Sequence, residues 1–279
     1  MKDDLIGSFE VQPYPLSRTA GIDTVSMGKL KHHIPVLLEV DVTAARAAIR
    51  RRKGDTGDAP SFTGWVVTCL AKALSEHKRV HAMRQGRRKL VVFDDVDVTV
   101  VVSREVADGD SNDALPIPCL IRRADRKSLD QLNAEIRAAQ SQPLGPGEQV
   151  LDAQGEAPSP WQMRLFLRLP WALRRLLVWN RLVKDPLYAK RTMGTVVVSS
   201  VGMYAGVGGG ATWFIPATMV PLSVAIGGIA RKPGYSEDTL QPREMLSMTV
   251  LFDHDVVDGA PVFAFVERLR GLMEGSFSL

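Results

Sequence analysis

The chain has 279 residues, of which 45% are hydrophobic and 24% are charged, and its formal net charge is +4. This length is enough to bury a substantial core, and the ordinary composition excludes a disordered or fibrous protein. The basic residues are spread along the chain without a recognisable nucleic-acid motif, so we expect no nucleic-acid partner.

The cysteines and the apolar runs bear on the compartment. Cys69 and Cys119 lie far apart among apolar residues, a pattern that favours buried thiols over a disulfide or a metal pair. No basic region followed by an apolar run opens the chain, and no apolar stretch approaches the ~20 residues of a membrane-spanning helix. We therefore expect a cytoplasmic protein.

Strands and helices alternate in the first half of the chain. Residues 34–42 alternate between apolar and other side chains and predict a strand, which a helix over 43–52 follows. Ser61 predicts the N-cap of an apolar helix over 62–77.

Two further strands and a helix are predicted next. Residues 90–104 predict a strand with a bend, and 115–122 predicts an edge strand or channel wall because Pro116 and Pro118 exclude it from the middle of a sheet. A capping box predicts a helix over 128–140.

The second half of the chain completes an α/β pattern. Residues 141–160 and 206–210 predict loops. Three more strands and a closing helix are predicted at 195–201, 222–229, 246–254 and 261–273. We expect a single domain over 1–279, with an inserted basic amphipathic helical segment at about 158–186.

The last strand carries the candidate chemistry. A row of alternate apolar residues begins at Met248 and ends at His254. We expect the backbone to turn at His254. A histidine held there meets the need of a general base for a fixed tautomer and orientation. Asp258 and Gly259 form the following turn, where Asp258 either caps the closing helix or holds a cation. The alternative interpretation of the same pattern is a structural histidine at a strand end, followed by an ordinary Asp-Gly turn.

A second strand carries hydroxyl groups. Thr195 begins it, Ser199 and Ser200 lie near its end, and Gly202 closes it. A serine at a strand end near a general base suits donation to a tetrahedral oxyanion. Ser199 is alternatively a nucleophile, although no Gly-x-Ser-x-Gly elbow surrounds it, or an edge hydroxyl bonded to backbone.

Several motifs in order resemble one family. The His-x-x-x-Asp-Gly motif at His254, the Gly-Thr-x-x-x-Ser-x-x-Gly strand from Gly194 and the order of elements from about Pro15 onward resemble the catalytic domain of 2-oxoacid dehydrogenase acyltransferases. This family includes the dihydrolipoamide acyltransferases and is related to the chloramphenicol acetyltransferases. The resemblance implies a two-layer sandwich with a mixed β-sheet, the chloramphenicol acetyltransferase-like fold, and a homotrimer with active sites between subunits.

The resemblance also implies roles for residues. His254 would deprotonate a thiol or hydroxyl acceptor that attacks an acyl-CoA thioester, Ser199 would donate to the oxyanion, and Asp258 would orient the site through a salt bridge. The implied substrate-binding residues are Thr195, Ser200, Gly202 and Gly259. Coenzyme A is then a substrate, and no metal is expected. No lipoyl lysine is expected in this chain, so a separate carrier or another acceptor would serve.

Three positions depart from the family pattern. Asp255 stands where the family usually has arginine, Ser200 where asparagine is common, and Ala20 where an N-terminal arginine is usual. The carboxylates from Asp253 to Asp258, if close in space, would favour the imidazolium and weaken the base. A catalytically idle scaffold on the same fold is therefore the alternative function.

A tryptophan-rich basic segment spans residues 161–184. It contains three tryptophans and six arginine or lysine residues but no acidic residue. One interpretation is a helical hairpin, kinked at Pro170, that packs over the channel mouth or a neighbouring subunit. The other is an amphipathic helix on an anionic membrane surface, which would make the protein peripheral to the membrane and a lipid-like acceptor plausible.

Overall fold

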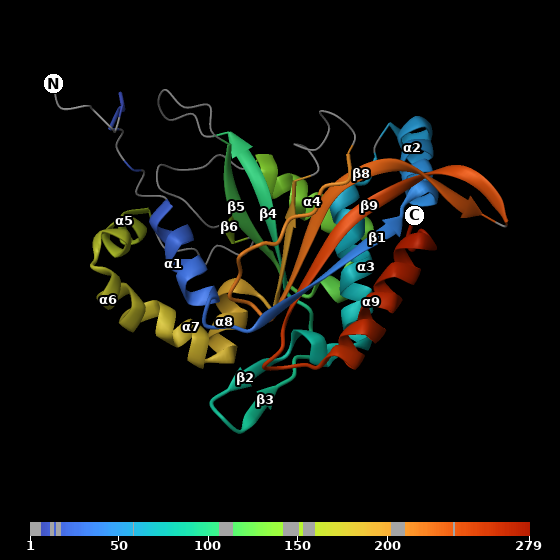
Figure 1. Cartoon of the computed structure of the whole chain (residues 1–279). Helices are drawn as coiled ribbons and strands as arrows, with labels where there is room; N and C mark the ends of the chain where they lie inside the picture. Colours follow the sequence, from blue (N-terminus) through green and yellow to red (C-terminus); the bar gives the residue numbers. More distant parts are fainter. Residues whose placement is uncertain are drawn as a thin grey trace.

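A mixed β-sheet organises the chain, as the computed structural model shows (Figure 1). The structure describes residues 7–11, 14, 18–57, 59–105, 114–141, 151–152, 160–201, 210–236 and 238–279. Within them, seven strands pair in the order β1-β9-β8-β7-β4-β5-β6. Their bounds are β1 His33–Asp41, β4 Val98–Glu105, β5 Ala114–Ile121, β6 Leu151–Asp152, β7 Val196–Ser200, β8 Leu222–Ser236 and β9 Thr239–Asp253. The pairs β4–β7, β7–β8 and β5–β6 are parallel, and the other neighbours are antiparallel.

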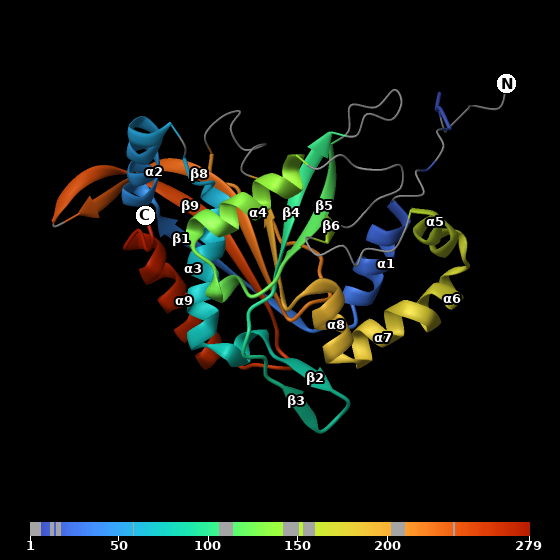
Figure 2. The same ribbon diagram turned by 180° about the vertical axis from the view of Figure 1, so that it is seen from behind.

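Helices cover one face of this sheet, as the view from behind shows (Figure 2). They are α2 Thr43–Thr56, α3 Phe62–Glu76, α4 Leu129–Ser141 and α9 Gly259–Glu274. The main core lies between these helices and the alternate strand residues that point toward them. Trp65 of α3 is completely buried there, and its indole N–H donates to the carbonyl of Phe277 at 3.0 Å. The predicted α/β two-layer sandwich is confirmed.

Local capping signals in the sequence match the helix starts. The Ser61 hydroxyl accepts from the Gly64 amide at 3.4 Å and opens α3. Before α4, the Ser128 amide donates to the Gln131 side chain at 2.9 Å, and the Gln131 amide donates back to the Ser128 hydroxyl at 3.2 Å. These bonds satisfy backbone groups that a helix end otherwise leaves unpaired.

The prolines of β5 lie where the sequence predicts an edge. Pro116 and Pro118 pair with β4 on one side. The short strand β6 pairs only with Cys119 and Leu120 of β5, beyond both prolines. Because proline has no N–H to donate, it is tolerated on a strand side that forms no ladder.

Two predicted strands differ from those observed. The 222–229 and 246–254 strands belong to 15-residue strands β8 and β9, whose outer arms form a long hairpin. Prolines face each other in that hairpin, Pro233 opposite Pro242, so the sequence there lacks a strand-like alternation.

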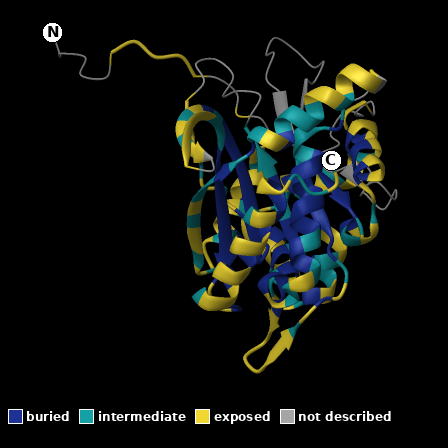
Figure 3. Ribbon diagram, turned by 90° about the vertical axis from the view of Figure 1, so that its right-hand side faces the viewer, coloured by how far each residue is buried: buried dark blue, intermediate teal, exposed yellow. Residues whose placement is uncertain are grey.

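The predicted strand over 90–104 is divided between two sheets. Its start, β3 Lys89–Val91, pairs with β2 Met83–Gln85 in a separate hairpin that projects as an exposed arm (Figure 3). β4 begins only at Val98. The carboxylate of Asp97 accepts from the Arg123 amide at 2.9 Å, which fixes the turn before β4.

The tryptophan-rich segment forms helices beside the N-terminal helix, away from α9 (Figures 1 and 2). The helices of the segment are α5 Pro160–Arg168, α6 Trp171–Arg174, a π-helical turn Arg175–Trp179 and α7 Asn180–Lys184. The helix α8 Pro186–Met193 follows the segment, and the neighbouring helix is α1 Arg18–Gly28. The Arg174 guanidinium donates to both oxygens of Asp23, at 2.6 and 2.9 Å, and the Trp179 indole donates to the same carboxylate at 3.0 Å. The segment therefore packs against α1 of its own chain.

The structure bears on two predictions, that the cysteines are buried and that no helix spans a membrane. Cys69 and Cys119 are both buried and are not joined in a disulfide, as predicted. Burial raises the pKa of the Cys69 thiol to about 12, so it is not a reactive thiolate at neutral pH. In the described ranges, every helix is too short or too polar to cross a bilayer.

Candidate active site

His254 lies at the exposed end of a buried strand. The alternate residues from Met248 to Phe252 contribute to the main core, which confirms the predicted row. His254 itself is exposed, and its backbone amide donates to the His32 carbonyl at 3.0 Å. Its ring lies 6.1 Å from that of Phe252 and has no hydrogen-bond partner among the described residues. The described residues thus hold the backbone of His254 but leave its ring exposed, so they do not fix the tautomer that a general base needs.

The buried carboxylate of Asp253 fixes the turn that carries His254. Asp253 is completely buried, and Lys31 donates to it at 2.9 Å. The other carboxylate oxygen accepts from the Asp255 amide at 3.1 Å, and the Asp253 carbonyl accepts from the Val256 amide at 3.0 Å. Lys31 is a functional candidate that the sequence did not indicate, because 222 positions separate it from Asp253.

The neighbouring carboxylates have partners or positions away from the candidate base. Asp253 is paired with Lys31, and an Asp255 oxygen lies 3.0 Å from Nδ1 of His32. Asp258 is the exposed N-cap residue of α9, but its side chain accepts no capping bond. It also forms no ion pair with any residue that the structure describes. Among the described residues, Asp258 thus forms neither a capping bond nor a salt bridge, and two of the three carboxylates already interact with other side chains.

The strand register separates Ser199 from His254 within one chain. Ser199 pairs with Ala225, which pairs with Thr249 on β9. His254 lies five positions beyond Thr249 in sequence, which corresponds to roughly 16 Å along a strand. Ser199 is half-buried on the sheet face opposite the core residues Val196 and Val198. The two predicted catalytic groups of a single chain thus do not meet.

The four predicted substrate-binding residues have different surroundings. Thr195 is completely buried, so contact with a substrate would require its hydroxyl to leave its present bonds with His81 and with the Asp97 carbonyl. Ser200 is half-buried at the end of β7. Gly259 begins α9, and a side chain at this position would have no atom within 4 Å of its Cβ. Gly202 and most of the predicted loop at 206–210 lie outside the described residues.

A second histidine, His81, is buried beside Thr195, the residue that precedes β7. Nδ1 of His81 lies 3.0 Å from the Thr195 hydroxyl, whereas its Nε2 is buried without a hydrogen-bond partner. Burial lowers the pKa of His81 to about 4, and the positive charges of Lys190 and Lys78 act in the same direction. This side chain is therefore neutral at neutral pH. No local pattern of residues around His81 distinguishes it as a candidate.

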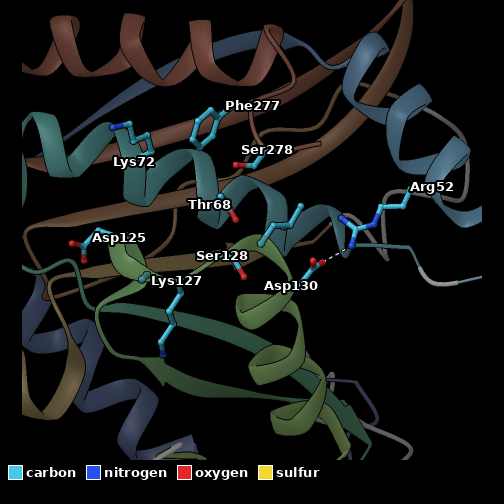
Figure 4. A pocket seen from close by; sticks show the side chains of 11 residues that line it. Arg52, Thr68, Lys72, Asp125, Lys127, Ser128, Asp130, Phe277 and Ser278 are labelled. Atoms are coloured by element: carbon cyan, nitrogen blue, oxygen red, sulfur yellow. Dashed lines mark hydrogen bonds and ion pairs between the residues drawn. The ribbon is translucent and has the colours of Figure 1, made fainter. Parts of the chain in front are cut away.

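A pocket of about 280 Å³ lies elsewhere, among α3, the start of α4 and the C-terminal residues (Figure 4). Its three cationic side chains already pair with carboxylates: Arg52 with Asp130 at 2.5 Å, Lys72 with Glu76 at 3.1 Å, and Lys127 with Glu135 at 2.6 Å. None of the predicted site residues lines it. We therefore assign the candidate chemistry to the strand ends.

Solved structures with the same fold are acyltransferase cores. A probable dihydrolipoamide acetyltransferase from Listeria monocytogenes superposes with a TM-score of 0.64 at 18% identity, over 97% of this chain and 96% of that chain. A dihydrolipoamide acetyltransferase from Azotobacter vinelandii gives 0.64 at 20% identity, over 97% and 94%. A 2-oxoacid dehydrogenase complex core from Thermoplasma acidophilum gives 0.61 at 18% identity, over 97% and 100%. A search of curated proteins found no match.

The sequence itself matches a family model over most of its length. The model describes the catalytic domain of the 2-oxoacid dehydrogenases acyltransferase family, and it matches residues 13–144 and 188–279. The unmatched interval, 145–187, contains the tryptophan-rich segment. With the matching fold, these two stretches show that the chain belongs to the 2-oxoacid dehydrogenase acyltransferase family and is an acyltransferase.

Proposed function

We propose that the protein transfers an acyl group between a coenzyme A thioester and a thiol or hydroxyl acceptor, with His254 as the general base. The observation that carries this proposal is the position of His254. Its ring is accessible at the end of a buried strand, while its backbone and the adjoining turn are held by His32 and Asp253. A base needs such a fixed backbone and an open ring to take a proton from a bound acceptor.

The register supports a site made by two copies of the chain. Since Ser199 and His254 are far apart within one chain, the serine that serves each histidine would come from a neighbouring copy. The solved neighbours include the cubic core of a pyruvate dehydrogenase complex, which is an assembly of many copies. We therefore propose a homotrimer, or a larger assembly of trimers, in which Ser199 of one subunit faces His254 of the next.

The proposed steps conserve atoms and charge. A ring nitrogen of His254 takes the proton of the acceptor thiol or hydroxyl, whose sulfur or oxygen attacks the thioester carbonyl. The Ser199 hydroxyl donates to the tetrahedral oxyanion, a contact typically worth about 10²–10³ in rate. When the intermediate collapses, the carbon–sulfur bond to coenzyme A breaks and the imidazolium returns its proton to the leaving thiolate.

Asp258 has a proposed role in orienting the site. The Azotobacter vinelandii relative was studied for the roles of a serine, a histidine and an asparagine in its catalytic mechanism, the last two being four positions apart. His254 and Asp258 have the same spacing. Because Asp258 has no ion pair among the described residues of its own chain, we propose that its partner comes from the neighbouring copy or from the substrate.

The test is thioester consumption with a panel of acyl-CoAs and a dithiol acceptor. We expect His254→Ala to lose about 10²–10⁴-fold and Ser199→Ala about 10²–10³-fold of kcat. His77→Ala, at the end of α3, is the matched control and is expected to keep its activity. Equal rates for wild type and His254→Ala would refute His254 as the base, and no thioester consumption by wild type would favour the catalytically idle scaffold.

Subunit mixing tests the shared site. Inactive His254→Ala and Ser199→Ala proteins, unfolded and refolded together, would form some sites with an intact histidine and an intact serine. Partial recovery of activity is expected. If each protein regains wild-type oligomeric state but the mixture stays inactive, the two groups do not act across subunits.

A further inference from the structure

One helix of the inserted segment exposes apolar and cationic side chains on the same face. In α5, Trp161, Arg164, Leu165 and Arg168 follow the i, i+3, i+4, i+7 spacing that aligns side chains on one side of a helix. All four are exposed, and Trp161 and Leu165 are 66% and 58% exposed. Large apolar side chains with this exposure gather at surfaces that bind a partner.

The next turns continue this composition. Leu173, Leu176 and Leu177 lie at i, i+3, i+4 spacing and are 45%, 66% and 59% exposed. Arg175 is also exposed, although the helical spacing points it to a different side from these leucines. We call residues 161–177 with these outward side chains the arginine–leucine face.

The inward side of the same segment is fixed to the body of the protein. Leu167, Trp179 and Leu182 are buried, and Arg174 is held by both oxygens of the Asp23 carboxylate. A buried pair with this geometry fixes the orientation of the helices. The exposed side chains of α5 and of residues 173–177 are therefore carried by helices whose inward side chains are anchored to the rest of the protein.

The charge of this face has one sign. Residues 160–184 contain no aspartate or glutamate, and of their six cations only Arg174 is buried. Arginine and tryptophan or leucine on one helix face suit the boundary of an anionic bilayer, where the guanidinium contacts lipid phosphate and the apolar side chain enters the acyl region. In a two-fold symmetric contact, the same face of a second copy would meet it with like charges.

We propose that the arginine–leucine face binds an anionic lipid surface and holds the acyltransferase against it. The family match omits residues 145–187, so this surface lies outside what the chain shares with its family. The proposal does not depend on which acyl group or acceptor the enzyme uses.

Sedimentation with lipid vesicles tests whether the exposed arginines of the arginine–leucine face bind anionic lipid. Wild type should bind phosphatidylcholine vesicles that contain phosphatidylglycerol and leave pure phosphatidylcholine vesicles free. Replacing Arg164, Arg168 and Arg175 together by glutamine should weaken binding on the order of 100-fold, since each cation near an anionic surface contributes about 1 kcal/mol, or about a factor of five. The control removes the same charge from the exposed β2–β3 hairpin, at residues 87–89, and should retain near-wild-type binding. No binding by wild type, or equal losses in both variants, would overturn the proposal.

The apolar side chains need a separate variant. Trp161→Ser with Leu165→Ser and Leu176→Ser should also abolish vesicle binding, and the wild-type tryptophan emission should shift to shorter wavelength on binding because Trp161 leaves water. Thioester consumption in solution should be unchanged in both variants, which separates this proposal from the catalytic one. If the serine variant instead changes the sedimentation coefficient of the free protein, a second copy covers this face and the lipid proposal is wrong.

Discussion

The buried histidine of the η1 turn, Lys78–His81, makes folding stability depend on pH. His81 is completely buried, and its pKa lies at about 4 against an ordinary value of 6.5. Between these values the unfolded chain binds a proton at this position and the folded chain does not. The contribution of His81 is therefore fully present above pH 6.5, and it is lost as the pH falls toward 4.

The magnitude follows from the size of the interval. From pH 6.5 down to pH 5, protonation of this histidine lowers the free energy of the unfolded state by about 1.36 kcal/mol for each pH unit. His81 alone therefore reduces the free energy of unfolding by about 2 kcal/mol at pH 5. That is a large fraction of the unfolding free energy of a typical domain, which is roughly 5–15 kcal/mol. Burial also lowers the pKa of His33, which contributes with the same sign. A variant of His81 is needed to separate the two.

Urea denaturation at pH 7 and pH 5 measures the effect, with all samples at one protein concentration. His81→Asn keeps a polar group that reaches the Thr195 hydroxyl but cannot be protonated in this range. We expect wild type to lose about 2 kcal/mol more than His81→Asn between the two pH values. If both proteins lose the same free energy, His81 stays neutral in the unfolded chain or is protonated in the folded one, and the reasoning from burial is wrong.

Three further substitutions test other contacts. Asp23→Ala leaves Arg174 buried without its carboxylate and should cost about 3–5 kcal/mol in urea denaturation; a loss below about 1 kcal/mol would mean that water reaches the guanidinium. Lys31→Met leaves the Asp253 carboxylate buried and unpaired, and we expect a lower kcat with little change in KM, with the helical circular dichroism retained; an unchanged kcat would show that this ion pair does not position His254. Ser61→Ala removes the cap of α3 and should cost about 1 kcal/mol in thermal denaturation, and an unchanged Tm would contradict the 3.4 Å cap bond.

Much of the fold was readable because its signals are local. A strand with one buried face alternates at period two, and a helix start needs a cap within three residues, so β1, α3 and α4 are where the sequence predicts them. His254 was readable for the same reason, as the end of an alternating strand before a turn. The β8–β9 hairpin was partly missed because its prolines and polar side chains carry no such alternation.

The tertiary structure decided which distant residues meet. The pairs Lys31–Asp253 and Asp23–Arg174 join residues 222 and 151 positions apart, and no local pattern encodes such a contact. Sheet register likewise decided that Ser199 and His254 of one chain are separated. The sequence by itself determined the candidate base, the family resemblance and the basic amphipathic segment. Only the folded chain determined what holds that base and which face of that segment is exposed, because both depend on the order of strands in the sheet and on long-range packing.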